Sequence, residues 1–83
     1  MQYQLIIEKR AQKDLDRIPT AYKDKFTKAF LALTDDPFMG KKLDGDLKGN
    51  YSLRVWPYRV IYRVYKKQLI VSVVYIGHRQ GVY

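Results

Sequence analysis

The chain contains no cysteine and only one histidine among its 83 residues. Without cysteine it can form neither disulfides nor thiolate metal sites, and one histidine is too few for a zinc site built by protein side chains alone. No apolar run approaches the about 20 residues of a membrane-spanning helix, and residues 1–5 lack the basic and apolar regions of a signal peptide. We therefore expect a cytoplasmic protein with no metal, no small-molecule cofactor and no membrane partner.

Acidic residues are also scarce, with 8 Asp and Glu against 16 Lys and Arg, which gives a formal net charge of +8. A charge of this size favours a nucleic acid or an acidic protein as the partner. The alternative is a basic domain whose charge serves no specific contact. The hydrophobic fraction of 47% is sufficient for a compact core, so we expect one small domain over residues 1–83.

Apolar periodicity predicts an α+β fold with the order β-α-α-β-β-β. Pro19 ends the first helix, and the second helix carries an apolar stripe that ends before Pro37. The two helices are expected to form a hairpin on one face of an antiparallel sheet, with the first strand at a sheet edge and the opposite face open and basic. The predicted elements are a strand over 2–8, helices over 9–18 and about 21–34, a loop over 37–50, and strands over about 51–56, 58–65 and 69–76.

Side-chain alternation along the last three strands separates an apolar face from a mixed one. A turn at Lys66-Lys67 is expected to pair Tyr62 with Val71. The apolar face, expected to pack on the helices, then consists of Tyr51, Leu53, Val55, Tyr58, Val60, Tyr62, Val64, Leu69, Val71, Val73 and Tyr75. The mixed face consists of Ser52, Arg54, Arg59, Ile61, Arg63, Ile70, Ser72, Val74 and Ile76.

Two arginines on the mixed face are the most informative feature of the chain. If Trp56-Pro57 forms the loop between the first two of these strands, Arg54 lies directly opposite Arg59. Like charges directly opposite each other destabilise an antiparallel ladder. A fold retains such a pair more readily when an anion lies between the two side chains, so we predict a site for a polyanion.

The segment from Lys42-Leu43 through Gly45, Leu47, Gly49 and Tyr51-x-Leu53-Arg54-Val55 to Tyr58-Arg59-Val60-Ile61-Tyr62 resembles the RelE/ParE superfamily of toxins. The ending Ile76-Gly77-His78-Arg79, followed by Val82-Tyr83, is similar to the RelE branch. The resemblance covers essentially the whole chain. It implies a toxin of a type II toxin–antitoxin system that cleaves messenger RNA on the translating ribosome, and a cognate antitoxin that neutralises it.

The resemblance also implies four catalytic residues. Arg54 occupies the place of a basic active-site residue, and Arg59 that of the arginine that stabilises charge on the scissile phosphate. Arg79 is similar to the C-terminal catalytic arginine of the family, and Tyr83 to its terminal aromatic residue, which orients the nucleotide. In the best-known members two lysines stand at the positions held here by Ser52 and Arg54.

Further basic residues are expected to contact RNA, namely Lys41, Lys42, Lys48 and His78. Strand alternation directs His78 to the face opposite Arg79. A guanidinium stays protonated, so the arginines provide no general base, and His78, Lys42, Lys48 and groups of the ribosome remain candidates. Two plainer readings stay open. Lys41-Lys42 could be a solvated charge run, and the two arginines could form surface ion pairs with Asp44 or Asp46.

Two other functions fit the same sequence. A ParE-like toxin would inhibit DNA gyrase without any enzymatic activity, and its basic face would bind protein. A catalytically weak domain would bind RNA or the ribosome with a strong dependence on salt concentration and leave no cut ends.

Overall fold

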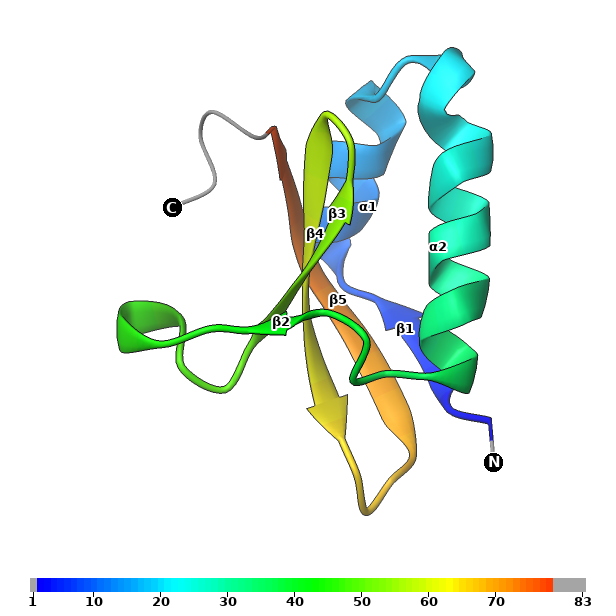
Figure 1. Cartoon of the computed structure of the whole chain (residues 1–83). Helices are drawn as coiled ribbons and strands as arrows, with labels where there is room; N and C mark the ends of the chain where they lie inside the picture. Colours follow the sequence, from blue (N-terminus) through cyan, green and yellow to red (C-terminus); the bar gives the residue numbers. More distant parts are fainter. Residues whose placement is uncertain (1, 79–83) are drawn as a thin grey trace.

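The computed structural model describes residues 2–78 and shows two helices packed on a five-stranded sheet (Figure 1). The helices are α1 (Lys9–Arg17) and α2 (Lys23–Asp35). The strands are β1 (Gln4–Ile7), β2 (Lys41–Lys42), β3 (Tyr51–Val55), β4 (Tyr58–Tyr65) and β5 (Ile70–His78). Two short 3₁₀ turns, η1 (Thr20–Tyr22) and η2 (Gly45–Leu47), complete the elements. The predicted α+β class and element order are confirmed.

The strands lie in the order β1-β5-β4-β3-β2. β1 is an edge strand, as predicted, and it pairs in parallel with β5, whereas the other neighbours are antiparallel. The prediction of a plain loop over residues 37–50 was wrong in part, because this segment contains β2 and η2. Its leucines explain the difference, since Leu43 and Leu47 pack on Ile61 of the sheet and hold the segment there.

The main core lies between the helices and one face of the sheet. Phe26, Phe30 and Leu33 of α2 are spaced at i, i+4 and i+7 and are all buried, as the apolar stripe predicts. α1 ends where expected, because Ile18, the residue before Pro19, adopts the extended backbone that a following proline imposes. The sheet contributes Val55, Val60, Tyr62, Val71, Val73 and Ile76 to this core.

The predicted register between β4 and β5 was wrong. Tyr62 pairs with Val73 rather than Val71, and the turn spans residues 66–69. A two-residue turn of type I′ would require positive φ at both lysines, whereas the longer turn needs it only at Leu69, where φ is 56°.

A register shift between Ile61 and Tyr62 then reverses the alternation along the end of β5. Ile76 therefore packs in the main core, although we predicted it on the mixed face. Tyr75, predicted for the core, packs instead against Ile61 and Leu43 on the other side of the sheet. The guanidinium of Arg10 lies 4.3 Å from the centre of the Tyr75 ring.

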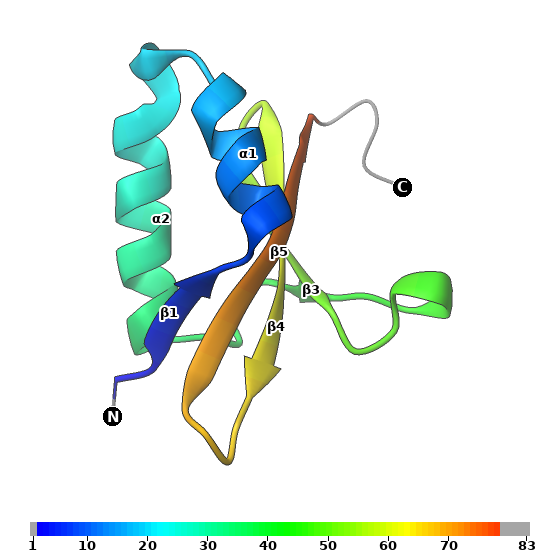
Figure 2. The same cartoon turned by 180° about the vertical axis from the view of Figure 1, so that it is seen from behind.

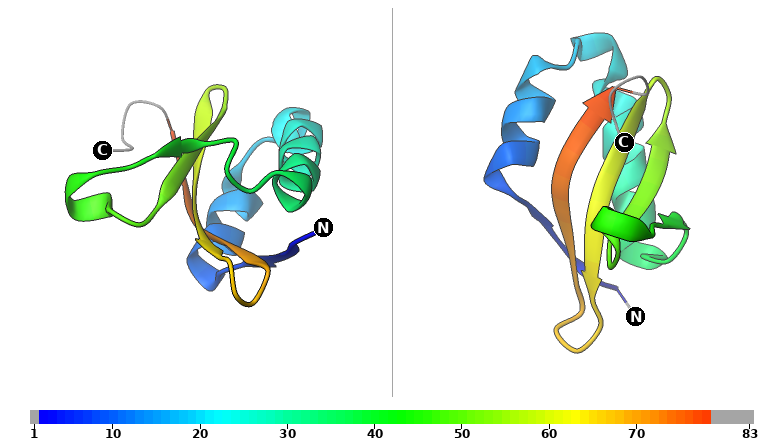
Figure 3. Two further views of the ribbon diagram at one scale, coloured as in Figure 1. Left: turned by 60° about the horizontal axis from the view of Figure 1, so that its bottom comes forward. Right: turned by 90° about the vertical axis from the view of Figure 1, so that its left-hand side faces the viewer.

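The two faces of the sheet are covered differently. Both helices lie on one side, and residues 43–50, which we call the arm, project from the other side (Figure 3). Beyond the end of β1, α1 runs beside β5 (Figure 2), where the Asp14 carboxylate accepts a 3.0 Å hydrogen bond from the backbone N–H of Ile76. Within residues 2–78, neither helix has the length and apolar character needed to cross a membrane.

Candidate nucleic-acid interface

The arginine pair, Arg54 and Arg59, lies at the end of the β3–β4 hairpin on the face that carries the arm. The two residues are directly opposite in the ladder, as predicted, and the neighbouring pair Val55–Tyr58 closes a two-residue loop at Trp56-Pro57. Arg54 is exposed and Arg59 is half-buried. Among residues 2–78, no ion pair joins Arg54 to Asp44 or Asp46, so the surface-pair reading does not hold for Arg54.

Two adjacent hollows share the arginine pair and Lys41. One, of about 380 Å³, extends toward Leu43 and Asp44 of the arm. The other, of about 350 Å³, extends toward Met39 and Ser52. Both hollows are therefore lined by the same three cations from three neighbouring strands, and a fourth, Lys42, lines the first hollow as well. We call the two together the cationic hollow.

Ser52 is buried beneath this hollow. Only 4% of its surface is exposed, and its hydroxyl oxygen has no hydrogen-bond partner among residues 2–78. It lies directly opposite Lys41 on β2 and Ile61 on β4. Because serine is small, the lysine side chain of the neighbouring strand has room to lie above it.

A buried tyrosine holds the segment that leads into β2. The Tyr62 hydroxyl donates a 2.8 Å hydrogen bond to the carbonyl of Pro37 and accepts a 3.0 Å bond from the N–H of Gly40. The chain passes so close that a Cβ on Gly40 would lie 2.5 Å from the Tyr62 hydroxyl and 2.8 Å from the carbonyl oxygen of Ser52. Glycine is therefore required here by close approach, and the contact fixes the backbone next to Lys41.

The environment of Tyr62 keeps its hydroxyl protonated. Burial raises the pKa of Tyr62 to about 12 from 10.0, because the phenolate would lose its hydration; the hydrogen bond from Gly40 opposes this shift. The hydroxyl can therefore act as a hydrogen-bond donor to Pro37 throughout the physiological pH range.

The other predicted site residues do not all gather here. Lys48 is exposed on the arm, and Asn50, at the arm's base, accepts a 3.0 Å hydrogen bond from Nε of Arg63. His78 pairs with Tyr58, and its ring lies edge-on to that tyrosine at 5.5 Å, on the side of the helices. It is therefore on the opposite face from the arginine pair. Arg79 and Tyr83 lie outside the described residues.

Lys41 and Lys42 have partners on opposite faces of the sheet, although Lys42 also lines the part of the cationic hollow next to the arm. Lys41 is opposite Ser52 on the face of the arginine pair, whereas Lys42 is opposite Tyr51, whose ring packs against the main core. The sequence did not distinguish the two lysines, because nothing in it signalled the short strand β2. The sequence also gave no sign that the Tyr62 hydroxyl would accept a hydrogen bond from Gly40.

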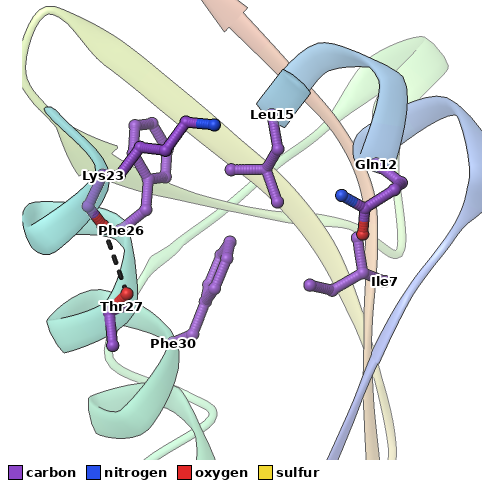
Figure 4. Close-up of a pocket in the computed structure, with 7 residues that line it drawn as sticks. All are labelled: Ile7, Gln12, Leu15, Lys23, Phe26, Thr27 and Phe30. Atoms are coloured by element: carbon purple, nitrogen blue, oxygen red, sulfur yellow. Dashed lines mark hydrogen bonds between the residues drawn. The ribbon is translucent and has the colours of Figure 1, made fainter. Parts of the chain in front are cut away.

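A separate hollow, of about 290 Å³, lies between α1 and α2, away from the cationic hollow (Figure 4). Its wall is mainly apolar, formed by Ile7, Leu15, Phe26 and Phe30, with Lys23 at its rim. With one cation and no arginine, it lacks the donors that suit phosphate. The cationic hollow is thus the stronger candidate for a polyanion.

Comparisons with known proteins identify the family. The family described as "ParE toxin of type II toxin-antitoxin system, parDE" matches residues 5–83. A putative RelE-like toxin protein of Escherichia coli is 32% identical over 83 residues, which cover 96% of this chain and 86% of that protein. The chain belongs to the RelE/ParE family of type II toxins.

Solved structures of this family share the fold. The RelBE2 toxin–antitoxin complex of Mycobacterium tuberculosis contains a chain with a TM-score of 0.88 and 26% identity, and the alignment covers 95% of this chain and 100% of that one. The archaeal RelE–RelB complex of Pyrococcus horikoshii gives a TM-score of 0.84 and 28% identity, with 99% and 100% covered. These RelE neighbours support the RelE-like branch of the family.

Proposed function

We propose that this RelE-like chain is an endoribonuclease that cleaves messenger RNA on the translating ribosome. The observation that carries the proposal is the arginine pair, held directly opposite across β3 and β4 on the face away from α1 and α2. The likeness to RelE-like toxins supports the same activity. A protein that acts on the translating ribosome would work in the cytoplasm.

The chemistry that suits this site uses the 2′-hydroxyl of the substrate as the nucleophile. Its attack on the adjacent phosphorus adds negative charge to the phosphate in the transition state. Guanidinium groups match phosphate oxygens in a bidentate way, and the Cβ atoms of directly opposite residues are about 4.5–5.5 Å apart, so Arg54 and Arg59 can grip one phosphate. Removing one preorganised donor of this kind lowers kcat by about 10²–10³-fold.

The remaining predicted contacts complete the proposal. Lys41 and Lys42 of β2, which line the cationic hollow, and Lys48 of the arm would contact the RNA. Arg79 would act on the leaving oxygen, and Tyr83 would stack on a base; both stay predictions, as does the contact of His78 with RNA.

The test is to map 5′ ends on a message in a purified translation system, with wild type and Arg59→Ala compared. We expect new ends within ribosome-occupied codons, absent without ribosomes and reduced about 10²-fold or more in the variant. Lys67→Ala is the control, because Lys67 lies in the turn between β4 and β5, at the opposite end of β4 from Arg59. A 2′-deoxy nucleotide at the cut site should block cleavage, and cleavage of the deoxy substrate would contradict the mechanism.

The second candidate is a toxin that inhibits DNA gyrase without cutting RNA. The match of the ParE family to residues 5–83 favours it. It predicts gyrase-dependent DNA breaks in expressing cells whose messages stay intact, whereas the nuclease predicts cut messages and intact DNA. A domain that only binds RNA or the ribosome would produce neither DNA breaks nor cut messages.

We also propose a cognate antitoxin as a binding partner, because both structural neighbours described above are toxin–antitoxin complexes. The charge of +8 favours an acidic protein. Co-expression with candidate acidic antitoxins should relieve growth inhibition and yield a stable complex; toxicity that no such protein relieves would count against this partner.

A further inference from the structure

The placement of Lys41 suggests a role that the arginine pair cannot perform. Side chains directly opposite on antiparallel strands point to the same face, so Lys41 shares the face of Ser52, and Arg54, two residues further along β3, lies on that face too. Lys41 also lines both parts of the cationic hollow together with Arg54 and Arg59. Lys42, the other residue of β2, lines only one of the two parts.

The distances allow all three cations to reach one phosphate group. Arg54 and Lys41 are diagonal neighbours across β3 and β2, a relation that places Cβ atoms about 7 Å apart. A lysine side chain spans that gap easily. Around this phosphate, two guanidinium groups are joined by the ammonium group of Lys41, and the two kinds of group differ in their ability to transfer a proton.

A guanidinium stays protonated in proteins, whereas an ammonium can release its proton and be recharged from water. Cleavage of RNA expels the 5′-oxygen as an alkoxide, which is a strong base and leaves faster when an acid protonates it. Two arginines can stabilise the phosphate charge, but neither suits this proton transfer. Two lysines line the cationic hollow, and Lys41 is the one that lines both of its parts and shares the face of Arg54.

Building on the proposed nuclease function, we propose that Lys41 is the general acid of the reaction. The 2′-oxygen forms a bond to phosphorus as its proton leaves to water, and the bond between phosphorus and the 5′-oxygen breaks. The ammonium of Lys41 gives its proton to the departing 5′-oxygen and regains one from water afterwards. The products are a 2′,3′-cyclic phosphate and a 5′-hydroxyl.

The fold supports this role by holding the backbone next to Lys41. Tyr62 binds the N–H of Gly40 and the carbonyl of Pro37, so the start of β2 is tied to the middle strand of the sheet. Transfer to one oxygen atom requires such placement, because proton transfer needs hydrogen-bond distance. Lys48 lies on the projecting arm and lines neither part of the cationic hollow.

The experiment compares two leaving groups. A message carries either the natural 5′-oxygen or a bridging 5′-sulfur at one mapped cut site, and single-turnover cleavage on purified ribosomes is measured for wild type, K41M and K41R. A thiolate leaves without protonation. We expect the cleavage rate of both variants to fall by about 10²-fold or more on the oxygen substrate. On the sulfur substrate both variants should cleave nearly as fast as wild type.

The arginine variant separates acid catalysis from simple charge. K41R keeps the positive charge, so it should bind programmed ribosomes as wild type does and still lose cleavage of the oxygen substrate. K67M, in the turn between β4 and β5, is the matched control and should cleave both substrates at the wild-type rate. Lys41 is exposed, so thermal unfolding of both Lys41 variants should match that of wild type.

Each contrary result has a distinct meaning. If the cleavage rates of the Lys41 variants fall equally on the oxygen and sulfur substrates, Lys41 only binds or positions RNA, and the proposal is overturned. Full activity of K41R on the oxygen substrate would overturn it as well. If wild type cleaves neither substrate, the nuclease function itself is wrong, and the acid role fails with it.

Discussion

Replacing Tyr62 with phenylalanine removes one hydroxyl that serves two backbone groups. The carbonyl of Pro37 loses a donor and the N–H of Gly40 loses an acceptor, while the ring and its stacking on Tyr51 at 5.4 Å remain. A buried polar group left without a partner costs about 1–3 kcal/mol. Pro37 is buried and Gly40 is half-buried, so we expect Tyr62→Phe to lower the free energy of unfolding by about 2–4 kcal/mol.

Urea denaturation at pH 7 measures this loss directly. The denaturation midpoint should fall while the slope with urea stays the same, because the surface exposed on unfolding is unchanged. Tyr51→Phe is the matched control. Tyr51 belongs to the same aromatic stack, and its hydroxyl has no hydrogen bond within residues 2–78, so its loss should change stability by less than about 0.5 kcal/mol.

The pKa of Tyr62 adds a dependence on pH with a defined sign. The folded-state pKa, about 12, exceeds the ordinary 10.0, so the folded protein holds this proton more tightly than the unfolded chain does. The resulting stability is fully present below pH 10 and is lost as the pH rises to 12, and two pKa units correspond to about 3 kcal/mol. The stability gap between wild type and Tyr62→Phe should therefore shrink over that interval.

Two results would refute this reasoning. One is a Tyr62→Phe protein within about 0.5 kcal/mol of wild type at pH 7, which would mean that water replaces both hydrogen bonds without cost. The other is a gap that stays constant or widens between pH 10 and 12, which would mean that burial does not hold the hydroxyl in its protonated form.

Three further predictions concern the surroundings of the cationic hollow. Gly40→Ala should lower the free energy of unfolding by about 1–3 kcal/mol in urea denaturation, because its Cβ would overlap the Tyr62 hydroxyl; wild-type stability would contradict the close approach. Ser52→Ala should leave stability unchanged or raise it, because the serine hydroxyl is buried without a partner, and a loss above about 1 kcal/mol would reveal a bond that the structure does not show. Arg54→Gln should reduce the slope of log affinity against log salt for single-stranded RNA by about 0.7; an unchanged slope would place the RNA elsewhere.

Much of the fold follows from local pattern. The apolar stripe of α2 and the alternation in β3 and β4 depend only on which neighbours share a face, so they can be read from residue types. Pro19 marks the end of α1 for an equally local reason. The loop at Trp56-Pro57 brings Arg54 opposite Arg59 by counting alone, and the central pair of the candidate site was therefore predictable.

The sequence by itself thus determined the element order, the core face of the hairpin and the arginine pair, because each rests on contacts between near neighbours in the chain. Only the tertiary structure decided the shift in register before Tyr62, the short strand β2 and the side of the sheet that Lys41 and His78 occupy. These depend on Leu43 packing on Ile61 and on the Tyr62 hydroxyl reaching Gly40, residues 18 and 22 positions apart in the chain. Such contacts form only once the sheet has brought distant segments together.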